Sequence, residues 1–322
     1  MIKTILISFS GGKTSAYMTW WLLRVKYKAT WDEILKFHVG MDELGNTVHL
    51  IIIFANTSKE NEETLDFVRN CDEHFGFNTI WIEAVVYPQY GKGNGAKIID
   101  FVSAKRKGEV FKQMIVKHGI PNMASKHCTR ELKATPIRAL MREKGFAPKQ
   151  YETAIGYRID EPKRWKGAKK RKAQILKRHL YYFVDEKPVT KLQVNGWWDI
   201  QEFNLMLDDY EGNCTLCYKK SEPKLIAFIC KMIYYKREDL FWGEMEKEFE
   251  QFVTPGKKHN KKIKVPIYFY RGHSSYEKLK EKALILLKDI HDEVGLQVLI
   301  DALINNYNPK QISLCSESCE PF

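Results

Sequence analysis

The sequence predicts an α/β fold in which a doubly wound parallel sheet is followed by an appended, mainly helical C-terminal part. Three observations predict this fold. Short apolar runs of strand length alternate with segments of helical length through the first 160 residues. A glycine pair directly follows the first apolar run, which indicates a tight turn from strand to helix. Beyond residue 160 the chain becomes strongly basic and then mainly helical.

The expected elements follow from these patterns in chain order. Strands are expected at residues 4–9, 50–55, 79–85 and 151–156. Helices are expected at residues 14–25, 60–75, 97–102, 110–118, 131–144, 276–287 and 294–305, and within 221–252. Because strands separated by helices need crossover connections, the sheet is expected to be parallel. Ligands of such sheets bind beyond the carboxyl ends of the strands, where the turns after the strands meet.

The turn after the first strand resembles a phosphate-binding loop. Gly12-Lys13-Thr14 does not end a Walker-type P-loop, because that motif needs a glycine at the position of Ile7. The segment instead predicts a shorter phosphate-binding turn, in which two glycines let the backbone approach a phosphate and the next helix supplies N–H donors. The candidate phosphate-binding residues of this segment are Ser8, Ser10, Gly11, Gly12, Lys13, Thr14 and Ser15.

The formal net charge of +12 favours a polyanionic partner. Nine of the sixteen residues from Lys163 to Arg178 are basic, and Trp165 among them favours nucleic-acid contact by stacking as well as by charge. A solvated loop is the plainer interpretation of the same run. No apolar run approaches the ~20 residues of a membrane span, and no secretory signal is visible, so a cytoplasmic chain without a membrane partner is expected.

Seven cysteines in a chain of this kind favour metal or redox use over disulfides. Cys214 and Cys217 form a Cys-x2-Cys pair beside a glycine, which is a common spacing for metal ligands. Cys71 and Cys230 lie in segments of helical length, where a buried structural thiol is the plainer interpretation. Unligated cysteines remain an alternative for the whole set.

Five segments in order resemble the PP-loop adenine nucleotide alpha-hydrolase superfamily, and most closely its phosphoadenosine phosphosulfate (PAPS) reductase-like family with a CxxC iron–sulfur-type site. The segments, which fall within residues 5–224, are SFSGGKTS, FANTSKENEETLDFV, HCTRELKATPI, GYRIDEPKRW and GNCTLCYKKS. Two positions depart from the family pattern. Thr14 stands where the synthetase branches carry Asp, so no carboxylate role is carried over there, and Ser58 replaces the usual glycine of the second segment.

The resemblance implies a Rossmann-like, PP-loop fold that binds ATP, or PAPS or adenylyl sulfate, with Mg. The implied nucleotide-binding residues are those of the loop together with Asn56, Thr57, Gly156, Arg158 and Arg271. The implied catalytic residues are Lys13, Arg158, Glu161 and Cys319. The implied substrate-binding residues come mainly from the basic run and from the turn that carries Cys214 and Cys217. They are Arg130, Lys133, Arg164, Lys169, Lys170, Arg171, Lys172, Lys219 and Lys220.

The resemblance also implies a [4Fe–4S] cluster, with zinc as the alternative. Its protein ligands would be Cys128, Cys214, Cys217 and Cys230, although His127 or an exogenous group could take the fourth position. The tail carries Cys315 and Cys319 without the reductase signature, so a thiol relay and an inert pair are both open. The expected units are an α/β domain at 1–160, a basic, cysteine-bearing and helical region at 161–310, and a flexible tail at 311–322.

The function implied is an ATP-dependent, adenylating and pyrophosphate-releasing sulfurtransferase that modifies a nucleic acid or nucleotide with sulfur held at the cluster. Its partners would be DNA or tRNA and a sulfur donor or thiol reductant, such as a cysteine desulfurase or thioredoxin. Two alternatives are kept. One is reduction of phosphoadenylyl or adenylyl sulfate through a C-terminal thiol, and the other is a non-catalytic nucleotide- or nucleic-acid-binding protein on the same fold.

Overall fold

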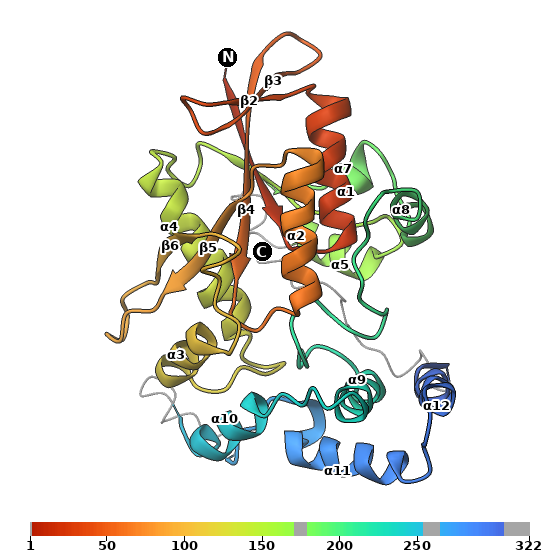
Figure 1. The fold of residues 1–322 in the computed structure, drawn as a ribbon. Coiled ribbons are helices and arrows are strands. Elements are labelled where there is room, and N and C mark those ends of the chain that lie inside the picture. Colours follow the sequence, from red (N-terminus) through yellow and green to blue (C-terminus); the bar gives the residue numbers. More distant parts are fainter. Residues whose placement is uncertain (1, 171–178, 254–264, 306–322) are drawn as a thin grey trace.

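The computed structural model describes residues 2–170, 179–253 and 265–305, which form a central sheet flanked by helices and a layer of helices at one end (Figure 1). The sheet is mixed but mostly parallel, and its strand order is β2-β3-β4-β1-β7-β8, with β5 paired to β4 and β6 paired to β5. The strands are β1 Lys3–Phe9, β2 Thr30–Asp32, β3 Phe37–Met41, β4 Thr47–Asn56, β5 Ile80–Val85, β6 Gly95–Ile99, β7 Glu152–Ala154 and β8 His179–Leu180.

Strand β4 organises the sheet because it pairs with three neighbours. Along one edge its first half pairs antiparallel with β3 and its second half pairs parallel with β5, while β1 runs parallel along the other edge. Strands β7 and β8 continue the parallel order beyond β1. After β1, the chain first adds strands on the β4 side of the sheet, and later adds β7 and β8 on the other side of β1. The order reverses between β1 and β7, which is where open α/β sheets bind ligands.

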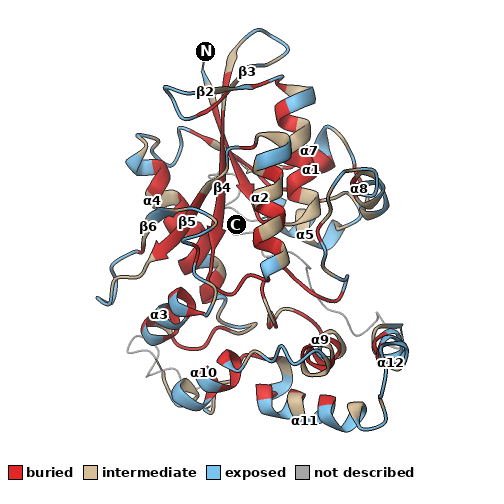
Figure 2. Cartoon of the chain, viewed as in Figure 1, coloured by how far each residue is buried: buried red, intermediate tan, exposed pale blue. Residues whose placement is uncertain are grey.

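Helices cover both faces of the sheet, as alternation along the buried strands requires. Ile5 and Ile7 of β1 pack with α1 (Lys13–Trp21), α2 (Glu62–Phe75) and α8 (Lys191–Trp198), whereas Leu6 packs with α4 (Thr135–Glu143). Strands β1, β4, β5 and β7 are buried along most of their length (Figure 2), whereas β2, β6 and β8 contain no buried residue.

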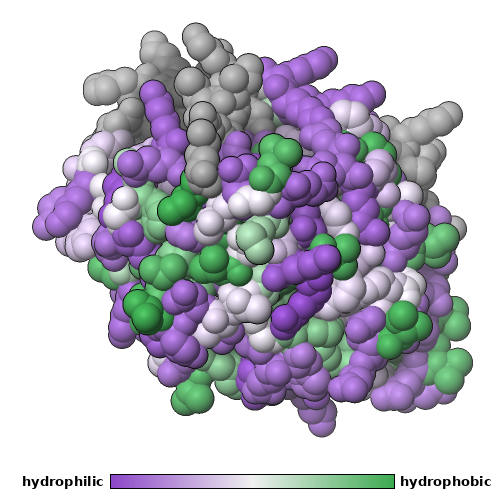
Figure 3. Space-filling view, turned by 90° about the horizontal axis from the view of Figure 1, so that it is seen from above, coloured by the Kyte–Doolittle hydropathy of each residue, from purple (hydrophilic) through white to green (hydrophobic). Residues whose placement is uncertain are grey.

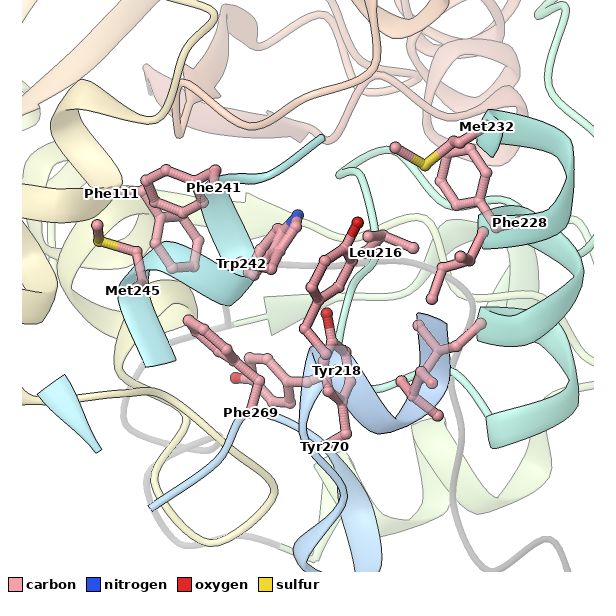
Figure 4. Packing of buried hydrophobic residues seen from close by; sticks show 14 of the residues in the cluster. Phe111, Leu216, Tyr218, Phe228, Met232, Phe241, Trp242, Met245, Phe269 and Tyr270 are labelled. Atoms are coloured by element: carbon pink, nitrogen blue, oxygen red, sulfur yellow. The ribbon is translucent and has the colours of Figure 1, made fainter. Parts of the chain in front are cut away.

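The C-terminal half adds a layer of helices at the lower end of the view in Figure 1. It comprises α9 (Glu222–Tyr234), α10 (Phe241–Phe249), α11 (Tyr276–Leu287) and α12 (Glu293–Asn305), which share a core with α3 (Glu109–His118). Trp242 and Phe269 lie at the centre of this core beside Leu216 and Tyr218 (Figure 4). The cysteine turn is thus anchored in the helical layer by its own apolar residues.

The structure confirms most of the expected elements and corrects several. The segment expected as a helix at 97–102 is instead the edge strand β6, whose backbone groups pair with β5. Strands β2, β3 and β8 were not expected. The sheet is therefore mixed, since β2, β3 and β6 pair antiparallel. Residues beyond 160 complete the same sheet through β8 and cover it with α8, so the expected boundary at 160 does not mark the end of the sheet.

Two expected helices contain stretches wound more loosely than an α-helix. The helix expected at 14–25 becomes a π-helix over Leu22–Lys26, and the one expected at 131–144 begins as a π-helix over Thr129–Ala134. The short helix α5 (Pro162–Lys169) lies within the basic run, and the short helix α7 (Tyr182–Asp185) follows that run. In the ranges described, no helix is both long and apolar enough to cross a membrane. The face seen from above has apolar side chains scattered among hydrophilic ones (Figure 3).

Candidate functional site

The loop after β1 depends on glycine at position 11. Gly11 has a φ of +77°, which L side chains rarely adopt, and a Cβ there would lie 2.6 Å from Thr64 Cγ2 and 3.1 Å from the ring of Phe54. Helix α1 begins two residues later, at Lys13. The end of a buried strand, a left-handed glycine and a helix N-terminus thus follow one another without a longer loop.

Hydroxyl groups fix the shape of this loop. Ser15 Oγ donates to the Gly12 carbonyl oxygen at 2.9 Å and lies 2.9 Å from Ser10 Oγ. Ser10 N also donates to Ser15 Oγ, at 3.3 Å. Because these hydrogen bonds are internal to the loop, they hold its backbone in place before any ligand arrives.

A hollow with an empty volume of about 790 Å³ lies at this loop, where β1 and β7 end. The close approach of the end of β7 to helix α1 depends on Gly156, where a Cβ would stand 3.1 Å from the Cα of Ser15. Of the expected nucleotide and catalytic residues, those that line the hollow are Ser10, Gly12, Lys13, Thr14, Ser15, Gly156, Arg158 and Glu161. Arg164, expected to bind substrate, lines it as well.

The cationic side chains of the hollow are held by neighbouring groups. Arg158 donates to Thr14 Oγ1 at 3.2 Å and to Asp160 Oδ1 at 3.0 Å, and its Nη2 lies 3.4 Å from Glu161 Oε1. Glu161 also accepts from Arg164 at 2.6 Å. Burial lowers the pKa of the Lys13 ammonium, and nearby carboxylates oppose this shift. The hollow is therefore lined by two lysines and two arginines, and the two arginines are held in position by carboxylates.

Sequence reasoning missed the opposite wall of the hollow. This wall comes from α8 and from the segment before the cysteine turn, and it includes Lys191, Asn195, Leu205, Leu207, Asp209 and Asn213. Trp198 Nε1 donates to the Lys13 carbonyl oxygen at 2.9 Å, which fixes α8 against the loop. One signal for this helix was available, since Thr190 and Gln193 form a capping box at its start.

Other expected nucleotide residues lie outside the hollow. Ser8 is buried within β1, and Arg271 lines a different pocket. Asn56 is fully buried and donates to Glu83 Oε1 and to the Lys105 carbonyl oxygen, both at 2.8 Å. These partners stabilise the strand end, and Asn56, which was expected to contact nucleotide, does not line the hollow. Thr57 faces the cysteines instead.

Ser58 has a backbone conformation that usually favours glycine. Its φ is +65°, in the left-handed region, and its Oγ accepts hydrogen bonds from Val110 N and Phe111 N at 3.0 and 3.2 Å. The hydroxyl therefore caps the start of α3. This contact offers a physical reason why a serine tolerates a conformation that otherwise favours glycine.

The cysteine turn docks directly on the glycine loop. Asn213 Nδ2 donates to the Ser10 carbonyl oxygen at 2.5 Å, and the Asn213 carbonyl oxygen accepts from Asn61 N at 2.7 Å. One residue further on, Cys214 forms an isolated antiparallel bridge with Glu60. The same short turn thus forms part of the hollow and carries the Cys-x2-Cys pair.

Three of the four expected metal-ligand cysteines line one small cavity. Cys128, Cys214 and Cys217 meet there from segments far apart in the chain, together with Thr57 and Lys133. Cys214 Sγ donates to Glu60 Oε2 at 2.8 Å, and Cys128 Sγ lies 3.3 Å from the Tyr218 hydroxyl. Within the described ranges, no three potential ligands lie close enough together to hold a metal ion as the side chains stand.

Cys230 does not join this group. It is fully buried in α9 with its Sγ 3.8 Å from the Ala283 carbonyl oxygen, and burial raises its pKa to about 12. His127, the other candidate for the fourth position, lines a separate pocket and stacks on His118 with ring centroids 5.6 Å apart. Neither lines the cysteine cavity, because the helix and loop that carry them face other parts of the helical layer.

Arg130 and Lys133, both expected to bind substrate, do not lie on the same face of their helix. Arg130 is exposed, whereas Lys133 is buried and lies 3.1 Å from Glu60 Oε1. The intervening turn is π-helical, so residues three apart no longer lie above one another as they do in an α-helix. Lys133 is therefore an interior partner of the cysteine cavity and not a surface group for substrate.

The expected basic surface is split among different environments. Lys169 and Lys170 are exposed on or next to α5, but Lys169 pairs with Asp185 at 2.5 Å, and Trp165 donates to the Ile159 carbonyl oxygen at 3.2 Å. Two further basic residues have partners inside the molecule. Lys219 donates to Thr129 Oγ1 at 3.0 Å, and Lys220 is buried and donates to the Glu211 carbonyl oxygen at 2.6 Å. The residues of these expectations that lie outside the described ranges are Arg171, Lys172, Cys315 and Cys319.

Comparison with known proteins finds a relative in Escherichia phage lambda, which is named "Uncharacterized nin region protein ORF290". The two chains are 28% identical over 321 residues, which cover 98% of this chain and 94% of the relative. No protein-family model matches the chain. No solved structure matches it either. The similarity to the phage protein extends over nearly the whole chain, and the name of that protein states no activity.

Proposed function

We propose that this chain is a PP-loop enzyme of the PAPS reductase-like family, which uses ATP to activate an acceptor and then transfers sulfur to it. One observation carries the proposal. The Cys-x2-Cys turn contributes Asn213 to the glycine-loop hollow and places Cys214 next to it in the chain, with Cys128 and Cys217 around the same cavity. The turn thus connects the glycine loop to a cavity that three thiols line.

The hollow offers the groups that activation by adenylation needs. The N–H groups at the start of α1 and the ammonium of Lys13 are suited to bind the phosphates, and Arg158 and Arg164 add charge at the mouth. An oxygen of the acceptor attacks the α-phosphate, the bond from that phosphorus to the bridging oxygen breaks, and pyrophosphate leaves with both electrons. The developing negative charge on the phosphates is what these cations would stabilise.

The thiols are positioned for the second half of the reaction. A persulfide sulfur, supplied by a donor and held on one cysteine, attacks the activated carbon, and AMP leaves with the acceptor oxygen. A second cysteine thiolate then attacks the inner persulfide sulfur, which releases the thiolated acceptor and forms a disulfide that a thiol reductant reopens. The Glu60 carboxylate accepts the Cys214 thiol hydrogen in the structure, so it is the group best placed to receive that proton.

A metal group fits this cavity in part. Cys128, Cys214 and Cys217 would supply three thiolate ligands to a [4Fe–4S] cluster or zinc, and the fourth position would be left for an exogenous group. When bound, such a group would supply a metal centre that holds sulfur or thiolate. The structure assigns no protein side chain to the fourth position, since Cys230 and His127 lie elsewhere.

The test measures products from ATP in the presence of tRNA or DNA and a sulfide donor. Pyrophosphate and AMP in equal amounts, with sulfur found in the nucleic acid, is the expected result. Arg158→Gln should lower the rate roughly 100-fold, as expected for loss of one charge that stabilises a transition state, whereas Lys36→Gln on the exposed β2–β3 turn should not change it. Sulfite release from adenylyl sulfate would instead establish the reductase, and neither product would leave a nucleotide-binding protein without catalysis.

A further inference from the structure

A second pocket lies next to the cysteine cavity and is not used by the function proposed above. It has an empty volume of about 1280 Å³ and is formed by residues 118–127 on one side and by parts of 252–273 on the other. We call it the histidine pocket, because His118, His127 and His273 line it together with Arg271. Arg271 was expected to reach the nucleotide phosphates of the glycine loop, and it belongs to this pocket instead.

The charge of the histidine pocket has one sign. Its described lining residues include an arginine and three histidines but no aspartate or glutamate. The Glu131 carboxylate lies 3.7 Å from His118 Nε2, but Glu131 does not line the pocket. A pocket with this lining favours an anionic ligand, and a guanidinium matches the geometry of a phosphate.

Arg271 is held in place at the wall of the pocket, because its Nη2 donates to the Lys219 carbonyl oxygen at 3.0 Å. Its Nε and the Tyr270 hydroxyl are fully buried, so they belong to the wall and not to the surface that a ligand would meet. Aromatic rings of Phe252 and Tyr268 also line the pocket and offer surfaces on which a planar group can stack.

The wall between the histidine pocket and the cysteine cavity is thin. His127 lines the pocket and Cys128, the next residue, lines the cavity. On the other side of the wall, the Tyr218 hydroxyl lies 3.3 Å from Cys128 Sγ, and the following residue, Lys219, is the one whose carbonyl oxygen holds Arg271. Neighbouring residues in the chain thus face the two spaces. A group bound in the pocket would lie near the thiols without passing through the glycine-loop hollow.

We propose that the histidine pocket binds a nucleotide residue beside the thiols, with the phosphate on Arg271 and the histidines and the base against the aromatic rings. This site does not depend on the proposed function, because it follows from the lining of the pocket alone. The nucleotide residue could be free or part of a nucleic-acid strand, and the chemistry of recognition is the same for both.

The experiment measures binding of UMP to the full chain by calorimetry, because a pyrimidine nucleotide avoids competition with adenine at the glycine loop. Uridine and inorganic phosphate are titrated separately and should each bind at least tenfold more weakly than UMP. A uridine trinucleotide that binds more tightly than UMP would identify a strand as the source, and equal binding would identify the free nucleotide. Binding of phosphate as tight as that of UMP would overturn the base-binding part, and no binding of any probe would overturn the site.

Variants separate this site from the glycine loop. Arg271→Gln and His273→Asn should each weaken UMP binding at least tenfold without changing ATP binding, and His291→Gln, an exposed histidine outside the pocket, should change neither. Asparagine suits position 273 because the residue has a φ of +56°. Lys13→Gln should lose ATP and keep UMP, so failure of one site does not imply failure of the other. UMP binding unchanged in both pocket variants would refute the proposal.

Discussion

Replacing Gly11 by alanine should destabilise the chain in two separable ways. The left-handed backbone at φ +77° costs an L residue about 1–2 kcal/mol. The new Cβ would also lie 2.6 Å from Thr64 Cγ2 and 3.2 Å from Val68 Cγ2, and such overpacking costs typically about 1–3 kcal/mol. The expected total loss in the free energy of unfolding is therefore about 2–5 kcal/mol.

Gly45 provides a matched control for the backbone part of this cost. Its φ is +76°, and an added Cβ there would meet nothing within 4 Å. Gly45→Ala should therefore lose only about 1–2 kcal/mol. The two variants are compared by urea unfolding of the whole chain, and the difference in free energy reports the crowding at the loop.

A second substitution tests the cause of the crowding directly. Thr64→Ser removes the Cγ2 atom and keeps a hydroxyl that can bond the Asn213 carbonyl oxygen, which Thr64 Oγ1 does at 3.3 Å. The double variant Gly11→Ala/Thr64→Ser should recover part of the lost stability, so the two substitutions should couple favourably in a double-mutant cycle. If Gly11→Ala costs no more than Gly45→Ala, or if the serine recovers nothing, the described packing under the loop is wrong.

Three further predictions concern buried charges and thiols. Lys133→Met removes one partner of the interior pair with Glu60 and should cost about 3–5 kcal/mol in urea unfolding, whereas Lys36→Met in an exposed pair should cost less than about 1 kcal/mol. Burial raises the pKa of Glu246 from 4.5 to about 7, so the folded chain keeps a proton that the unfolded chain has lost. Stability should therefore fall by roughly 3 kcal/mol as pH rises through that window, and Glu246→Gln should remove this slope; a variant with an unchanged pH profile would contradict it. Cys230, whose pKa burial raises to about 12, should resist iodoacetamide in the folded chain and react after unfolding, as read by mass spectrometry.

The glycine loop was predictable because its chemistry is local. Buried strand, two glycines and helix start follow each other in the sequence, and the backbone angles and contacts of Gly11 match that reading. The cysteine pair was equally visible from its spacing. Its third member, Cys128, came only from the family resemblance, and the structure brings it to the same cavity across 86 residues.

Predictions of helices from the sequence were wrong where contacts with neighbouring segments changed the local structure. Residues 97–102 have no strong pattern of their own, and pairing with β5 makes β6 a strand. Arg130 and Lys133 share a face only if the turn between them is α-helical, and the π-helical turn sends one to solvent and the other to Glu60. The second wall of the hollow was invisible, since Asn195 and Asp209 are brought to it by the packing of α8 and not by any motif.

By itself, the sequence determined the alternating α/β character, the position of the glycine loop and the Cys214/Cys217 pair, because each depends on residues within a few positions of one another. The tertiary structure alone decided which side chains share a space. Asn213 connects the cysteine turn to the glycine loop, and Lys133 is buried beside Glu60. Cys230 lies outside the cysteine cavity, and Arg271 lines a second pocket. The physical reason is that contacts between distant segments follow from packing and hydrogen bonding of the whole chain, which no local pattern records.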